Sequence, residues 1–195
     1  MIDQIIHWDI KLFLFIQENI RNPLMDAFVP LLRNRFTWIP LYFFLFYWLW
    51  SRFGSKSIRV LLLTSILIFV SDQSSSSLIK PTVKRNRPCN NTEISSKFKP
   101  LIPCGSGYSF TSSHATNHFA LAMFIGLILY KKNRGFLFGL MVWAGLVACS
   151  QVYVGVHYPL DVIAGAMLGV VLGGIFGIIA LKVFKFATWI DSSTP

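Results

Sequence analysis

Apolar residues run along this chain in long stretches that are separated by short polar or basic segments. Five stretches approach the roughly 20 helical residues that a bilayer core of about 30 Å requires, at residues 36–53, 57–78, 112–130, 135–153 and 159–181. Separate segments of this length cross lipid only as helices, because lipid offers no partner for an unpaired backbone group. The pattern therefore predicts five transmembrane helices. In residues 1–35, charges and prolines interrupt the pattern, so we expect an amphipathic interfacial helix followed by a short or partly inserted one.

Two smaller patterns refine this expectation. Gly165, Gly169 and Gly173 recur at four-residue spacing in the last stretch, which predicts a face for close helix packing. The serine run at residues 74–77 ends the second stretch, and we interpret it as packing and capping residues. No basic n-region or cleavage site marks a signal peptide.

The composition agrees with a membrane protein. Hydrophobic residues make up 54% of the 195 residues and charged residues only 13%, about half of the roughly 25% typical of soluble domains. A soluble globular domain is therefore disfavoured. The net charge of +10 fits nucleic acid, an anionic bilayer or an anionic substrate, and the positions of the charges must distinguish these.

Most basic residues outside residues 1–35 occupy two kinds of place. Three groups lie at helix connections on one side of an alternating topology: Arg52, Lys56 and Arg59; Lys131, Lys132 and Arg134; Lys182 and Lys185. The positive-inside tendency makes this side cytoplasmic. The remaining cluster lies in the polar segment 79–110, which is then an outer loop, and its charge favours binding of a local anion there. Nucleic acid is not expected as a partner, because this location is hard to reconcile with it.

Two cysteines bracket the outer loop. Cys89 and Cys104 lie in a compartment that permits oxidation, whereas Cys149 lies in an apolar stretch. We predict a Cys89–Cys104 disulfide, whose loop closure contributes about 3 kcal/mol in the entropic model. Two independent free thiols are the alternative.

Three polar groupings stand where the predicted helices meet the outer face, at residues 80–88, 108–114 and 150–161. They are distant in sequence but lie on one side, so a common site is possible. Lys80 and Arg87 offer charge to a phosphate, and the arginine fork can form paired bonds to its oxygens. Ser112 and Ser113 precede a helix start that is suited to an anion, with N-capping alone as the alternative. His114 can donate a proton to a leaving oxygen.

The third grouping contains His157 and Asp161 at four-residue spacing. Asp161 can accept the Nδ1 proton of His157 and orient the ring, so that the other nitrogen can attack. A hydrogen-bonded structural pair is the second reading, but a carboxylate in a membrane segment costs about 2.5–3.5 kcal/mol, which favours a functional use. A metal site that adds His114 and His118 to this pair is the main chemical competitor. It lacks the Glu of His-Glu-x-x-His, and the surrounding cations would repel a divalent metal.

At these residues the sequence resembles the type 2 phosphatidic acid phosphatase superfamily of membrane lipid phosphatases. That family shows the motifs K-x6-R-P, P-S-G-H and S-R-x5-H-x3-D, and the resemblance covers residues 36–181. It implies a bundle of six transmembrane helices, the first supplied by residues 1–35, and no metal or cofactor. It also implies the following roles: phosphoryl oxygens held by Lys80, Arg87, Ser112 and the backbone N–H of Ser113; a phosphohistidine formed on His157; orientation by Asp161; and protonation of the leaving group by His114.

The sequence departs from these motifs at three positions. Thr111 stands where the family has Pro, and Ser113 stands where it has Gly, which adds a side chain beside the phosphate. Gln151 replaces the Arg of the third motif, so one charge-assisted bond is weakened and activity is expected to fall roughly 10- to 100-fold unless Lys84 or Arg85 compensates. On this basis Gln151→Arg is expected to preserve or raise activity.

The sequence thus predicts an all-α, polytopic membrane helix bundle with six transmembrane helices, five of them clear. Residues 1–35 form the N-terminal interfacial or first transmembrane region, and residues 36–190 the catalytic core. We interpret the protein as a lipid phosphate or diphosphate phosphatase with its active site on the periplasmic face of a bacterial-type cytoplasmic membrane. An isoprenyl diphosphate such as undecaprenyl diphosphate is the first substrate expected, followed by phosphatidylglycerol phosphate, phosphatidic acid and lipid A phosphate. The alternative is a non-catalytic lipid-phosphate binder with a degenerate site.

Overall fold

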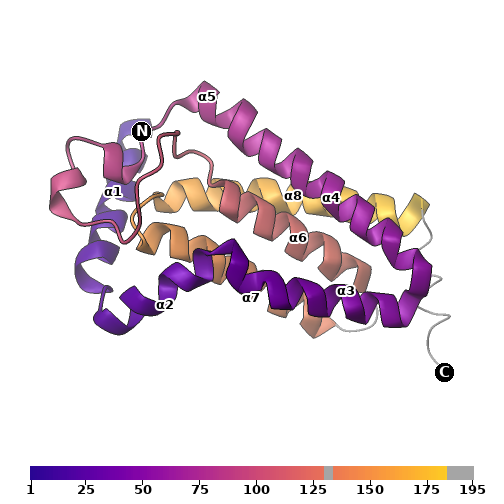
Figure 1. Ribbon diagram of the computed structural model, residues 1–195. Coiled ribbons are helices and arrows are strands. Elements are labelled where there is room, and N and C mark those ends of the chain that lie inside the picture. The colour runs from indigo at the N-terminus through magenta and orange to yellow at the C-terminus, as the bar shows by residue number, and fades with distance from the viewer. Residues whose placement is uncertain (130–133, 184–195) are drawn as a thin grey trace.

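The computed structural model describes residues 1–129 and 134–183, and its regular structure within them is entirely helical (Figure 1). Five helices run side by side along the bundle and correspond to the five predicted stretches: α3 (Ile39–Phe53), α4 (Ser57–Gln73), α6 (Ser113–Leu129), α7 (Arg134–Tyr153) and α8 (Pro159–Val183). The predicted all-α bundle is therefore confirmed. Lys131, Lys132 and Lys185 lie outside the described residues.

Three segments are long and apolar enough to cross a membrane by length and composition: Gly54–Lys97, Arg134–Tyr153 and Pro159–Lys182. The apolar helices α6 and α3 are shorter, with 17 and 15 residues. The chain is thus a multi-pass membrane protein, and the count of six spans stays a prediction.

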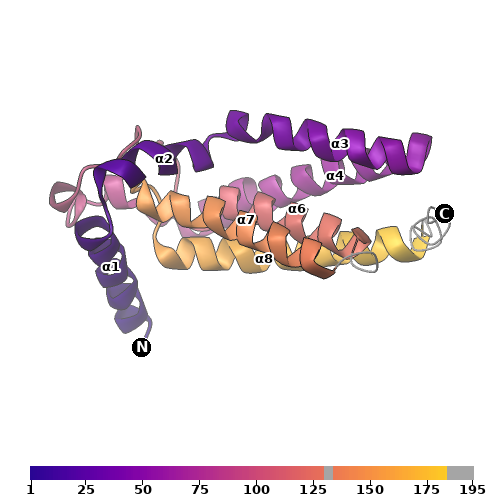
Figure 2. The ribbon, with the colours of Figure 1, turned by 90° about the horizontal axis from the view of Figure 1, so that it is seen from below.

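The two ends of the bundle differ in character. The connection between α3 and α4, the end of α6 and the end of α8 gather at one end (Figure 2). The opposite end carries the loop that follows α5 (Lys80–Val83), with its short helices η4 (Pro88–Asn90) and η5 (Ser95–Lys97). In this loop Cys89 and Cys104 form a disulfide with their Cα atoms 6.1 Å apart. The alternating topology therefore separates the basic connections from the polar groupings.

The glycine face of α8 packs against α6. A Cβ atom on Gly165 would lie 2.6 Å from the carbonyl oxygen of Ser112, and one on Gly169 or Gly173 would collide with a carbonyl oxygen of α6. Side chains at these positions would force the helices apart. The predicted packing face is confirmed, and it places the start of α8 directly against the start of α6.

The serine run adopts an uncommon geometry. α4 continues through a π-helical turn, η3 (Ser74–Ile79), into α5. Such turns are rare and frequently occur at functional sites. α5 ends at Lys84, whose φ of 52° is left-handed, and this turn directs the chain into the outer loop.

Residues 1–35 form two helices. α1 (Ile2–Asn19) crosses the end of the bundle, and α2 (Pro23–Arg33) leads through η1 (Arg35–Trp38) into α3 (Figure 2). One face of α1 is buried, with Asp9, Phe13 and Gln17 at four-residue spacing. Gln17 donates hydrogen bonds from Nε2 to two carbonyl oxygens at the end of α7, at 2.9 and 3.2 Å. This face attaches α1 to the connection between α7 and α8.

Candidate active site

The three predicted groupings converge at the end of the bundle that carries the outer loop. His157 lies in the connection between α7 and α8, close enough to interact electrostatically with Lys80 and Arg87. His114, in the first turn of α6, lies within electrostatic range of both Lys80 and His157. The two histidines and the two cations therefore share one site, although they come from three distant segments.

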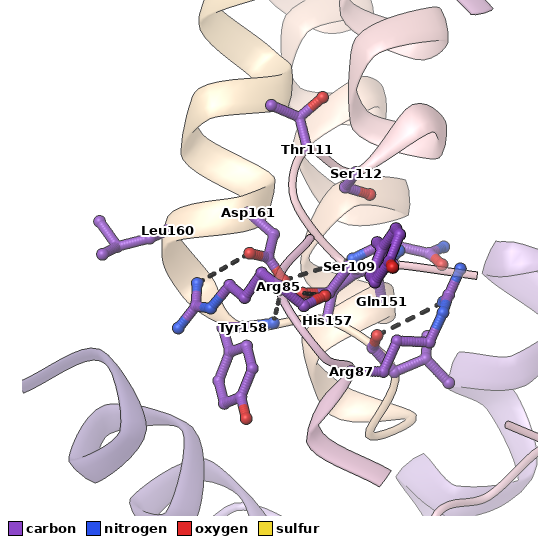
Figure 3. A network of polar contacts seen from close by, with 12 residues as sticks. Arg85, Arg87, Ser109, Thr111, Ser112, Gln151, His157, Tyr158, Leu160 and Asp161 are labelled. Carbon is purple, nitrogen blue, oxygen red and sulfur yellow. Dashed lines mark hydrogen bonds and ion pairs between the residues drawn. The ribbon is translucent and has the colours of Figure 1, made fainter. Parts of the chain in front are cut away.

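Asp161 is the centre of a buried network (Figure 3). Its side chain has no exposed surface. Oδ1 accepts a hydrogen bond from Nη1 of Arg85 at 2.8 Å, and Oδ2 accepts one from the backbone N–H of Tyr158 at 2.8 Å. Nδ1 of His157 lies 3.5 Å from Oδ2, an ion-pair distance that is longer than a well-formed hydrogen bond. Asp161 is thus fixed independently of His157 and holds its charge beside the imidazole.

His157 is held in its neutral form. Only 4% of its side chain is exposed, and burial lowers its pKa to about 4, although the charge of Asp161 acts in the opposite direction. At neutral pH the imidazole is therefore uncharged. This is the form that has a lone pair available for attack.

Arg85 connects the catalytic segment to α1. Its Nη2 forms an ion pair with Oδ2 of Asp9 at 2.6 Å, while its Nη1 holds Asp161. The guanidinium carbon lies 3.9 Å from the centre of the Tyr158 ring, within the range of a cation–π contact. Oδ1 of Asp9 in turn accepts the backbone N–H of Leu160 at 2.9 Å. One arginine thus neutralises two buried carboxylates and orders the segment that carries Asp161.

Backbone carbonyls of the outer loop orient the two predicted phosphate-binding cations. Nζ of Lys80 donates to the carbonyl oxygen of Tyr108 at 3.1 Å. Nε of Arg87 donates to the carbonyl oxygen of Gly107 at 2.8 Å. Each contact uses one donor of a side chain that has several. The loop therefore aligns both cations while leaving donors for an anion.

Ser112 caps the site end of α6. Its backbone N–H donates to the carbonyl oxygen of Asp161 at 3.0 Å, and its Oγ accepts the N–H of Ala115 at 3.4 Å. The first contact joins the second and third groupings directly. The hydroxyl of Ser113 lies 2.9 Å from that of Ser75, in the π-helical turn.

Two of the three departures from the family motifs meet at Ser75. Its Oγ lies 3.0 Å from Oγ1 of Thr111 and 2.9 Å from Oγ of Ser113. Thr111 and Ser113 stand where the family has Pro and Gly. The added side chain of Ser113 therefore contacts the π-helical turn, and the three hydroxyls form one largely buried cluster that ties the start of α6 to this turn.

Removing the Ser75 hydroxyl should destabilise the protein. Ser75→Ala leaves two partner hydroxyls to find other hydrogen bonds, and an unsatisfied buried polar group costs about 1–3 kcal/mol. Thermal or denaturant unfolding in detergent measures the loss. Ser77→Ala is the matched control, because Ser77 lies in the same run but is exposed and bonds only to Gln73 among the described residues. Equal stability of the two variants would contradict the role of the cluster.

The third departure has a partner that the sequence did not predict. Nε of Arg33, the last residue of α2, donates to Oε1 of Gln151 at 2.9 Å. From the sequence, Lys84 or Arg85 was a candidate to compensate for Gln151. Arg85 instead pairs with Asp9 and Asp161, and Lys84 is exposed at the end of α5. The cation that contacts Gln151 is thus Arg33, from another helix.

Sequence reasoning therefore missed Asp9, Arg33 and the structural role of Arg85. A signal for Asp9 existed: it lies four residues before Phe13 and eight before Gln17, so these three residues share one face of the helix. No local signal distinguishes Arg33 from the other basic residues. Its partner lies 118 positions away in the chain.

The second histidine of α6 contacts the first. Nδ1 of His118 lies 2.8 Å from the carbonyl oxygen of His114, and the two rings are stacked with their centres 6.3 Å apart. Within residues 1–129 and 134–183, no group of three or more His, Cys, Asp or Glu side chains is arranged to hold a metal ion.

Known proteins resemble this chain in sequence and in fold. The model of the PAP2 superfamily matches residues 59–185. The chain is 31% identical to the lipid A 4'-phosphatase of Bacteroides thetaiotaomicron, over 100% of this chain and 85% of that protein. It is 29% identical to the lipid A 4'-phosphatase of Porphyromonas gingivalis, over 93% of this chain and 77% of that protein. The crystal structure of a transmembrane PAP2-type phosphatidylglycerolphosphate phosphatase from Bacillus subtilis superposes with a TM-score of 0.67 at 21% identity, over 92% of this chain and 88% of that one.

Proposed function

The chain belongs to the PAP2 superfamily. From that membership and from its similarity to two lipid A 4'-phosphatases, we propose that it hydrolyses a lipid-linked phosphomonoester through a phosphohistidine. The observation that carries the proposal is the neutral, buried His157 beside Asp161, within electrostatic range of Lys80, Arg87 and His114. A nucleophile, an acid and a cationic phosphate cradle are the parts that such a reaction requires.

The reaction follows from these positions. Lys80 and Arg87 bind the phosphoryl oxygens and stabilise the charge that develops on them. The lone pair of His157 forms the N–P bond as the P–O bond to the lipid breaks, and the alcohol oxygen takes a proton from His114. The proton on the other ring nitrogen of His157 is stabilised by Asp161. In the second step water attacks phosphorus and gives a proton to His114, which is thereby protonated again. The N–P bond breaks with its electron pair returning to His157, and inorganic phosphate leaves. The chain supplies these groups without a metal or cofactor.

A groove beside the site fits the lipid part of such a substrate. It has a volume of about 540 Å³ and is bordered by α3, α4 and α6. Tyr42, Leu61, Ile68 and Leu121 contribute to its mainly apolar lining, and His118 reaches it one turn along α6 from His114. An acyl chain in this groove would place its phosphate near His114.

For the substrate we propose the 4'-phosphate of a lipid A-type glycolipid. Two relatives that match this chain over nearly its whole length are lipid A 4'-phosphatases. This proposal moves isoprenyl diphosphates, the first expectation from the sequence, to second place. The topology supports an active site on the periplasmic face of the inner membrane, because the basic connections gather at the opposite end of the bundle.

Phosphate release from defined lipids tests this function. The purified protein in detergent is given lipid A with its 4'-phosphate, undecaprenyl diphosphate, phosphatidylglycerol phosphate and phosphatidic acid, each with and without EDTA. We expect turnover that is at least about tenfold faster on lipid A, with loss of the 4'-phosphate seen by mass spectrometry and no effect of EDTA. Binding of these lipids without release of phosphate would instead favour the non-catalytic binder, and EDTA-sensitive turnover would favour a metal.

A further inference from the structure

Arg33 stands out because it is a partly buried cation without an anionic partner. Among the described residues, no carboxylate forms an ion pair with it, and its one hydrogen bond runs from Nε to Gln151. Its two terminal nitrogens, which form the fork suited to a phosphate, have no partner there. A guanidinium in this condition is expected to have a ligand.

The surroundings of Arg33 indicate the charge of that ligand. Arg33 lies close enough to Arg87 for the two positive charges to repel each other. It also lies within electrostatic range of His114. Like charges held together in a partly desolvated site are unfavourable, and an anion between them removes the repulsion. The proximity of Arg33 and Arg87 thus favours one anion site that the two cations share.

Gln151 determines where Arg33 points. Gln151 is fully buried, and its Nε2 donates to the carbonyl oxygen of Val147 and to Oγ of Ser150, both at 3.3 Å. These bonds direct Oε1 toward Arg33, where it accepts the Nε hydrogen at 2.9 Å. The amide thus uses one acceptor to fix the guanidinium while leaving its fork available.

We propose that Arg33 is a phosphate-binding residue of the active site and that Gln151 is its positioning residue. The proposal rests on the proposed function and adds a third cation to Lys80 and Arg87. Arg33 comes from α2, outside the residues 59–185 that the family model matches. The guanidinium that the third motif carries on α7 in the family has thus been moved to α2 in this chain, with Gln151 left to hold it.

This arrangement reverses the expectation for Gln151→Arg. An arginine at position 151 would place a second buried cation against Arg33 and remove the acceptor that orients it. We now expect Gln151→Arg to lower activity. The same substitution in an Arg33→Gln background restores the original pairing of one Arg with one Gln, with the two side chains exchanged.

A double-mutant cycle tests the proposal. Arg33→Gln, Gln151→Arg and the double variant are compared with wild type for turnover of lipid A, for inhibition by inorganic phosphate and for thermal unfolding in detergent. Each single variant should lose roughly 10- to 100-fold in kcat/KM, and for Arg33→Gln the inhibition constant of phosphate should rise by a similar factor. The double variant should recover to within about fivefold of wild type. Arg59→Gln, at an exposed residue at the far end of α4, is the matched control and should leave kcat/KM and the inhibition constant of phosphate unchanged.

The outcomes separate this proposal from the proposed function. If wild type turns over lipid A and Arg33→Gln leaves the phosphate inhibition constant unchanged, Arg33 does not bind phosphate. If the double variant is no better than the weaker single variant, Gln151 does not position Arg33. If wild type releases no phosphate from any lipid, the proposed function fails, while the stabilisation of wild type against unfolding by inorganic phosphate still tests Arg33. Equal stabilisation of Arg33→Gln would then overturn its role.

Discussion

Replacement of His157 by Ala should abolish phosphate release. His157 is the side chain that we propose accepts the phosphoryl group, so without it the two-step reaction loses its nucleophile. Single knockouts of a nucleophile in well-characterised hydrolases cost several orders of magnitude, and we expect a loss of roughly 10³-fold or more in kcat. Release of inorganic phosphate from lipid A at saturating substrate measures this loss.

The design of this experiment must distinguish chemistry from folding. Inhibition by inorganic phosphate cannot be measured in a variant without turnover. The cations that bind phosphate are intact in His157→Ala, so inorganic phosphate should still stabilise this variant against unfolding. His7→Ala is the control, because His7 is exposed on α1. Turnover by His157→Ala within tenfold of wild type would show that another group attacks phosphorus.

Replacement of Arg85 by Met should cause the largest loss of stability. The side chains of Asp9 and Asp161 are 1% and 0% exposed, and removal of Arg85 leaves both carboxylates buried without their cation. Breaking a buried ion pair by removing one partner costs about 3–5 kcal/mol. Denaturant unfolding in detergent, followed at the same detergent concentration for each variant, measures the change. Lys84→Met removes a neighbouring exposed cation and should change the unfolding free energy by less than about 0.5 kcal/mol.

A second substitution identifies the cause. Asp9→Asn removes one of the two carboxylates that Arg85 neutralises, so the penalty for Arg85→Met should be smaller in the Asp9→Asn background. Strict additivity of the two substitutions would show that Arg85 contributes by packing on Tyr158 and not by its charge. The coupling, if present, also makes α1 part of the support of Asp161.

The N-terminal helices therefore contact the candidate active site. Asp9 and Gln17 attach α1 to the connection that carries His157, and α2 supplies Arg33. These contacts come from residues before the stretch that the family model matches, so this part of the site lies outside that stretch. Removal of α1 would withdraw the carboxylate that Arg85 shares with Asp161.

Local sequence patterns were enough to predict the helical bundle, the glycine face of α8 and the convergence of Lys80, His114 and His157 at one end. Hydropathy over about 20 residues reports burial in lipid directly, and alternation of the helices then places every second connection on the same side. Motif spacing predicts proximity in the same local way, because residues four apart, such as His157 and Asp161, lie about one helical turn from each other.

The contacts that complete the site were not predictable in this way. Arg33 meets Gln151 across 118 residues, and Asp9 meets Leu160 across 151. Such pairs depend on how helices pack against one another. The residues around Arg33 do not indicate which of the 18 basic residues will contact Gln151. Composition and periodicity thus specified which segments enter the membrane and which chemistry they bring. The folded arrangement alone selected which cation stands beside Gln151 and which neutralises Asp161, because burial makes the energy of a charge depend on neighbours that are distant in the chain.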